Sequence, residues 1–178
     1  MRKLFFSLII FISLGAAAQG SGMTVSFKGI GPFKPGMKKA EVEKITGKKI
    51  TLKNLLTEDG WADTIRINYQ NAGFNLYFEK QYTDSVNFEY GLYGVQTTSA
   101  LCKTSAGIGI GTDKLKIITT YEFNGINIWP EYEGPDFMIK SKTKSIVTVS
   151  DDEGYNAIVF HLLNNKVASI EVSYFQGD

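Results

Sequence analysis

One pattern occurs twice in the chain at a fixed spacing, and this repeat constrains the fold more than any other feature. Residues 36–42 and 111–117 each follow a glycine-punctuated apolar stretch and begin a segment with helical periodicity. Residues 92–96 and 167–171 repeat at the same spacing. Self-similarity at a fixed spacing is typical of tandem copies of one structural unit. The sequence therefore predicts two similar units.

Each copy predicts a short helix of about ten residues. The first is expected after Pro35-Gly36, with Gly47 as its stop and Val42 and Ile45 on its apolar face. The second is expected to begin at an N-cap of Thr112 or Asp113. Its predicted apolar face consists of Leu115, Ile118 and Tyr121.

Strands are predicted after each helix. Residues 65–69 and 74–78 alternate apolar and polar side chains around a turn at Gly73, which predicts a hairpin with one buried face. In the second copy, the corresponding turn is expected at Gly154. The runs expected to form its antiparallel meander are residues 146–149, 155–163 and 166–174, with 125–129 and 136–140 as added strands separated by a turn at 130–135.

The predicted fold class is therefore α+β, with two similar units, each a short helical segment packed on an antiparallel β-meander. The first unit is expected at residues 19–97 and the second at 98–178. The repeat at residues 36–42 and 111–117 and the order of helix before meander resemble two related groups: the tandem domains of the β-lactamase inhibitor protein (BLIP) family and the SmpA/OmlA outer-membrane assembly lipoproteins. The resemblance implies that the sheet face away from the helices binds a partner.

Residues 1–18 have the composition of a secretory signal peptide. Arg2 and Lys3 precede an apolar run, and Ala16 and Ala18 supply the small residues that signal peptidase requires. The run is too short to span a bilayer. A lipid anchor like that of the assembly lipoproteins would need an N-terminal cysteine, and the chain's one cysteine is Cys102. We expect a soluble, exported protein, periplasmic or extracellular.

The charge balance argues against nucleic acid as a partner. The whole chain has 19 Lys and Arg and 18 Asp and Glu, and loss of residues 1–18 removes two basic residues and no acidic one, which leaves a net charge of about −1. A nearly neutral chain without a block of like charges has no electrostatic footprint for nucleic acid or for an anionic membrane surface. The expected partner is a protein or an envelope component.

Few residues carry catalytic chemistry. Cys102 and the single histidine, His161, are the one available nucleophile and base, and Asp151 or Asp152 could orient the imidazole. A small hydrolase using Cys102 and His161 is therefore the alternative to a non-enzymatic binding protein. No supporting motif surrounds either residue, and we expect neither to be catalytic.

Two other segments resemble ligand sites only in part. Residues 107–111 are rich in glycine but lack the Gly-Lys-Ser/Thr of a phosphate loop, so they predict a flexible lead into the second helix. Residues 151–154 are acidic but lack the alternating ligand spacing of a calcium loop, so they predict a polar hairpin turn. We expect no cofactor and no metal.

The aromatic residues give the strongest functional indication. Tyrosine and tryptophan provide large contact areas and tolerate water, and they are therefore enriched at binding surfaces. The alternative is that they fill or flank the cores. The candidate partner-binding residues are Tyr77, Tyr93, Trp129, Tyr132 and Tyr174.

Overall fold

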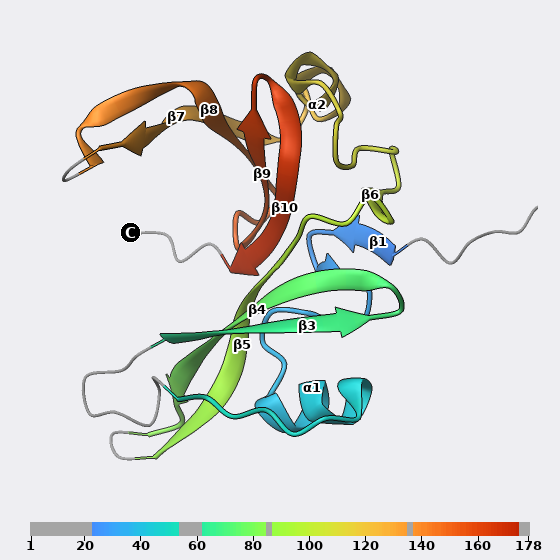
Figure 1. Ribbon diagram of the computed structural model, residues 1–178, viewed down its shortest axis with the longest axis vertical. Coiled ribbons are helices and arrows are strands. Elements are labelled where there is room, and N and C mark those ends of the chain that lie inside the picture. Colours follow the sequence, from blue (N-terminus) through green and yellow to red (C-terminus); the bar gives the residue numbers. More distant parts are fainter. Residues whose placement is uncertain (1–22, 54–61, 85–86, 135–136, 175–178) are drawn as a thin grey trace, which may run out of the picture.

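The computed structural model describes residues 23–53, 62–84, 87–134 and 137–174 (Figure 1). The predicted signal peptide lies outside these residues. The described chain has an α+β fold in which antiparallel strands predominate. Its helices are α1 (Lys39–Thr46) and α2 (Lys114–Thr120). None of the described helices is long and apolar enough to cross a membrane.

The strands form two sheets. The larger has seven strands in the order β3-β4-β5-β10-β9-β8-β7, and every neighbouring pair in it is antiparallel. Its strands are β3 (Ala62–Tyr69), β4 (Ala72–Tyr82), β5 (Phe88–Thr97), β7 (Gly125–Glu133), β8 (Ile139–Ser150), β9 (Asn156–Leu163) and β10 (Lys166–Tyr174). The smaller sheet consists of β2 (Gly29–Ile30), β1 (Met23–Ser26) and β6 (Cys102–Thr104).

Local sequence accounts for several of these boundaries. Gly47 ends α1 in the left-handed conformation, which glycine adopts without a steric penalty. The Asp113 carboxylate begins α2 by accepting a hydrogen bond from the Leu115 N–H. Two hairpins turn through consecutive residues with positive φ, Gln70-Asn71 and Asn164-Asn165, which matches the right-handed twist of the flanking strands.

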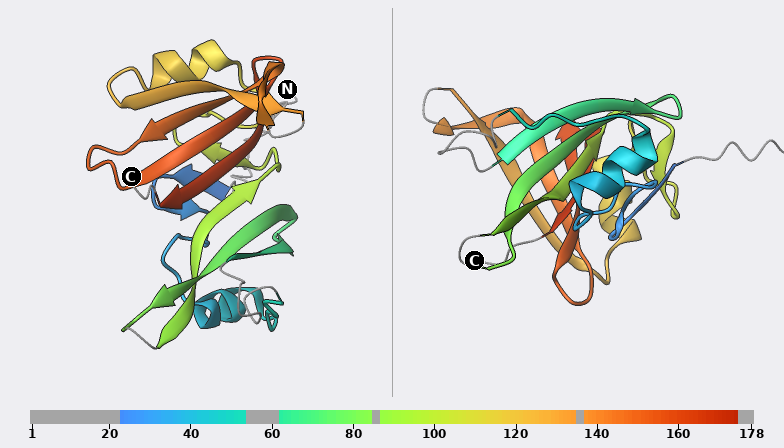
Figure 2. Two further views of the ribbon diagram at one scale, coloured as in Figure 1. Left: turned by 90° about the vertical axis from the view of Figure 1, so that its left-hand side faces the viewer. Right: turned by 90° about the horizontal axis from the view of Figure 1, so that it is seen from below.

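The core lies on one face of the seven-stranded sheet, which we call the covered face. Phe74, Leu76 and Phe78 point into the core, as their alternation predicts, and all three are buried. Both helices and the small sheet lie on this side (Figure 1). The opposite face, which we call the open face, is seen in the left panel of Figure 2. Buried residues from both halves of the chain belong to one hydrophobic cluster.

The structure corrects the predicted face of the second helix. Leu115 is 66% exposed, whereas Ile117 is completely buried. Tyr121, which directly follows α2, packs against the core and lies 6.3 Å from the Phe160 ring. Ile117 and Tyr121 lie on the same side, because side chains one helical turn apart share a face. The helix faces the core with Ile117 rather than with Leu115.

The strands of the structure add three further details to the predicted arrangement. The turn expected at residues 130–135 begins later in the chain, because β7 continues through Pro130 to Glu133. Proline is tolerated there because β7 is an edge strand. A strand that was not predicted, β6, follows Thr97 and pairs in parallel with β1. The two predicted meanders also share one sheet, joined where β5 pairs with β10.

Candidate functional site

Polar and aromatic side chains gather on the open face where β5 meets β10. One row across the sheet runs through Asn75, Gln96 and Glu171, which pair in register on β4, β5 and β10. The Asn75 side-chain amide donates to Gln96 Oε1 at 3.0 Å. Because side chains alternate along a strand, these residues point away from Phe74 and Leu76 and from the core.

A pair of tyrosines adjoins this row. The rings of Tyr77 and Tyr93 stack with centroids 5.7 Å apart and planes 26° apart. Burial raises the pKa of Tyr77 to about 12, and the Glu171 carboxylate contributes to the rise. Burial also raises the pKa of Tyr93, with smaller contributions from Glu171 and Glu79. Both hydroxyls are therefore neutral near neutral pH, and two carboxylates lie close to the stack.

The histidine lies on the same face, between two carboxylates. Its Nδ1 is 3.4 Å from Glu131 Oε1, and its Nε2 is 3.6 Å from Glu171 Oε2, slightly longer than a hydrogen bond. Glu131 belongs to β7, so its side chain reaches past β8 to contact His161 on β9. The Glu171 carboxylate raises the pKa of His161, burial lowers this pKa, and the Glu131 carboxylate adds to the rise. The imidazolium form fits this position because both ring nitrogens then carry a proton and each faces a carboxylate.

The titration of His161 should show this environment directly, since His161 is the one histidine of the chain. By NMR we expect a pKa above the ordinary 6.5, and Glu171→Gln should lower it. A raised folded-state pKa stabilises the fold fully below the unfolded-state pKa, and this stabilisation disappears as the pH rises through the folded-state value. The stability advantage of wild type over His161→Gln should therefore shrink as the pH rises above about 6.5, the ordinary pKa of histidine. An advantage that grows with pH would contradict the assignment.

The five aromatic residues predicted to bind a partner do not form one cluster. Tyr77 and Tyr93 lie together on the open face, and neither is fully buried. Trp129, 46% exposed, aligns with Ile146 and His161 in the neighbouring strands and shares their face. Tyr132 lies near the far end of the β7–β8 hairpin. Tyr174 is on the covered side, where its hydroxyl donates to the Pro35 carbonyl.

The structure places Cys102 and His161 on opposite sides of the sheet. Cys102 is completely buried in the core, and its thiol donates to Thr97 Oγ1 at 3.8 Å. Burial raises the pKa of the thiol, which disfavours the nucleophilic thiolate. The carboxylates beside His161 are Glu131 and Glu171, not the predicted Asp151 or Asp152. The geometry therefore offers no nucleophile–base pair from these two residues.

The backbone N–H groups of the glycine-rich segment are engaged within the fold. Gly107 donates to the Thr104 carbonyl, Gly109 to Thr112 Oγ1 and Gly111 to the Val167 carbonyl. These groups are not available to a phosphate. In the acidic turn, the Asp151 carboxylate accepts hydrogen bonds from the backbone and side chain of Asn156. This bonding closes the turn and lowers the pKa of Asp151.

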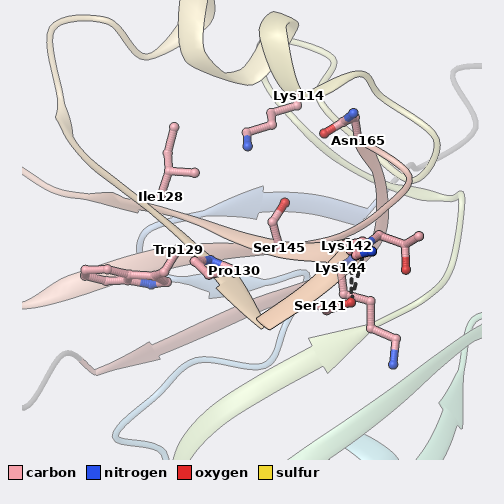
Figure 3. Close-up of a pocket in the computed structure, with 10 residues that line it drawn as sticks. Lys114, Ile128, Trp129, Pro130, Ser141, Lys142, Lys144, Ser145 and Asn165 are labelled. Carbon is pink, nitrogen blue, oxygen red and sulfur yellow. Dashed lines mark hydrogen bonds between the residues drawn. The ribbon is translucent and has the colours of Figure 1, made fainter. Parts of the chain in front are cut away.

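A cavity of about 290 Å³ lies between the start of α2 and the β7–β8 hairpin (Figure 3). No acidic side chain lines it among the described residues. The Lys144 backbone N–H donates to Ser141 Oγ within it, and the Lys144 ammonium pairs with Glu133 at 3.2 Å. The residues that line the cavity are Lys114, Ile128, Trp129, Pro130, Ser141, Lys142, Thr143, Lys144, Ser145 and Asn165.

Comparison with family models, with curated proteins and with solved structures gives no match for this chain.

Sequence reasoning found the two tyrosines but missed their polar surroundings. Glu131, His161 and Glu171 belong to three different strands, so no local motif connects them. The available signal was the alternation in residues 166–174, which places Glu171 between the buried Ile170 and Val172 and therefore on the outer face.

Proposed function

We propose that this chain is an exported, non-enzymatic protein that binds another protein or an envelope component through the open face. The observation that carries the proposal is the stack of Tyr77 and Tyr93 beside Glu79 and Glu171, on a face that no described helix covers. Half-buried tyrosines bordered by polar groups have the composition of a recognition surface.

The charges of this surface favour a basic partner segment. Glu79, Glu131 and Glu171 are acidic, whereas Arg66 lies out on β3, in register with Asn75. A lysine or arginine side chain could contact a tyrosine ring and a carboxylate together, and each contact favours a cation. The separation of Cys102 from His161 supports a binding role over the hydrolase alternative.

We also infer that the seven-stranded sheet is built from two equivalent units, β3-β4-β5 and β8-β9-β10, with β7 added to the second. Backbone hydrogen bonds support this inference. In the first half, the Gly36 N–H donates to the Leu92 carbonyl and the Leu92 N–H donates to the Met37 carbonyl. The second half has the same two bonds at residue numbers higher by 75. There the Gly111 N–H donates to the Val167 carbonyl and the Val167 N–H donates to the Thr112 carbonyl. The single bridges Lys38–Gly91 and Asp113–Lys166 are related in the same way.

Strand irregularities follow the same relation. Tyr93 of β5 has no paired residue on β4, and Ala168 of β10 has no paired residue on β9, so each strand has a bulge at that residue. Ala168 is the residue that corresponds to Tyr93 when 75 is added to its number. Bulges are specific features of a strand pair, so their coincidence argues for a repeated unit.

The strand register also changes which residues near the turns at Gly73 and Gly154 correspond to each other. Phe74 faces Thr97 and Ile158 faces Val172, so Phe74 corresponds to Ile158 rather than to Tyr155.

The proposed relation explains where the site lies. Gln96 and Glu171 correspond to each other under this shift, and they face each other across the joint between β5 and β10. Around this joint the two units differ, because Tyr77 in the first corresponds to His161 in the second. A repeated backbone thus carries unlike side chains, aromatic on one side and ionisable on the other, which suits a partner without two-fold symmetry.

Affinity capture from envelope extracts tests the proposed function. We compare wild type with Glu79→Gln/Glu171→Gln and with the matched control Glu122→Gln/Glu153→Gln, which removes two exposed carboxylates elsewhere. We expect wild type and control to retain one discrete partner, and the open-face variant to bind it at least about tenfold more weakly because charge pairs are lost. Equal retention by both variants would contradict the acidic site.

A further inference from the structure

The β7–β8 hairpin presents an apolar end to solvent. Phe137 is 77% exposed, Met138 78% and Ile139 61%, and the three residues are consecutive. The hairpin projects away from the rest of the sheet (Figure 1), and none of the three residues belongs to the hydrophobic core cluster. Contiguous exposed apolar groups of this kind mark an interaction site rather than ordinary surface. We call Phe137, Met138 and Ile139 the apolar tip.

Lysines follow the tip directly. Lys140 and Lys142 are exposed and have no carboxylate partner among the described residues, while Lys144 pairs with Glu133. Glu131 is turned to His161. The charged groups left available on the described hairpin are therefore cationic. The cavity in Figure 3 adds Lys114 to this region, and no acidic side chain is among its described lining residues.

Amphipathic aromatic residues lie behind the tip. Tyr132 and Trp129, each 46% exposed, occupy β7 on the way back to the sheet. Tyrosine and tryptophan are enriched at the level of lipid headgroups, where one end of the side chain is apolar and the other is wet. The order along the hairpin is thus an apolar end, then lysines and amphipathic rings.

We propose that the β7–β8 hairpin binds the surface of an anionic phospholipid bilayer. The apolar tip enters the boundary between headgroups and acyl chains, and Lys140 and Lys142 contact lipid phosphates while their aliphatic stems remain in the apolar layer. A second copy of the chain fits less well, because a two-fold contact would bring the same lysines together. A near-zero net charge is compatible with this site, since the attraction depends on local charge within a Debye length.

Vesicle flotation tests the proposal. The full mature chain is mixed with vesicles of phosphatidylcholine alone or with added phosphatidylglycerol. The variants are Phe137→Ser/Met138→Ser/Ile139→Ser and Lys140→Gln/Lys142→Gln; the control Leu115→Ser/Phe123→Ser removes two exposed apolar side chains near α2. Circular dichroism checks that each variant is folded. A Trp61→Phe background leaves Trp129 as the single tryptophan, so its fluorescence reports lipid contact.

We expect wild type and control to float with the anionic vesicles, with a blue shift of Trp129 emission. The triple variant should lose at least about tenfold in partitioning, and the lysine variant about fivefold for each charge removed, on anionic vesicles only. No flotation of wild type, or equal flotation of the triple variant, would overturn the proposal. So would a wild-type dimer in lipid-free solution that the triple variant converts to monomer without any lipid binding, because the tip would then bind a second copy.

Discussion

Replacing Phe160 by alanine is expected to lower the free energy of unfolding by about 3–5 kcal/mol, and Leu76→Ala by about 2–5 kcal/mol. Both side chains are completely buried. Phe160 lies on β9 and Leu76 on β4, on the two sides of the joint between β5 and β10, and the proposed repeat relates their positions. Losses of this size are large against the total stability of a typical domain, about 5–15 kcal/mol.

Both variants should unfold in a single transition, because the buried residues of the two halves form one cluster and share one sheet. Denaturant unfolding followed by circular dichroism and by tryptophan fluorescence measures this. Leu115→Ala is the control and should change stability by less than about 0.5 kcal/mol, since Leu115 is exposed. Two separate transitions, of which each substitution moves only one, would show that the halves fold independently.

The elements that sequence predicted best have strong local signals. Helix α1 ends at Gly47, and the alternation over residues 74–78 places three side chains in the core. The face of α2 could not be predicted in the same way, because the helix is short and Leu115, Ile117 and Ile118 are all apolar. Hydrogen bonds from the preceding segment to Val167 fix the rotation of the helix, and these partners are distant in sequence.

The joint between the halves was also beyond a sequence-based prediction. Nothing local indicates that β5 pairs with β10 or that β1 pairs in parallel with β6, because each pairing brings together segments that lie far apart along the chain. The same limit applies to the candidate site. Tyr77 could be predicted as outward-facing from alternation, but Tyr93 lies at a bulge that interrupts the alternation of β5. Glu131 and Glu171 reach His161 only through the sheet order.

The second large effect is expected for partner binding. Tyr93→Ala should weaken the affinity for the partner by about 2 kcal/mol or more, roughly 30-fold, because tyrosines in the middle of an interface are frequent hot spots. Tyr93 stacks on Tyr77 and lies beside Glu171. Tyr155→Ala is the matched control, because Tyr155 is 67% exposed in the β8–β9 turn, outside the strands of the open face. Titration of the captured partner with each purified variant measures the difference.

Photo-crosslinking in intact cells tests the open-face site most directly. A photoreactive phenylalanine analogue replaces Tyr93 in one chain and Tyr155 in another, and the products are separated after irradiation. The proposed site predicts a discrete crosslinked partner from position 93 and none from position 155. Crosslinks from position 155 alone, or the same products from both positions, would contradict a partner site on the open face.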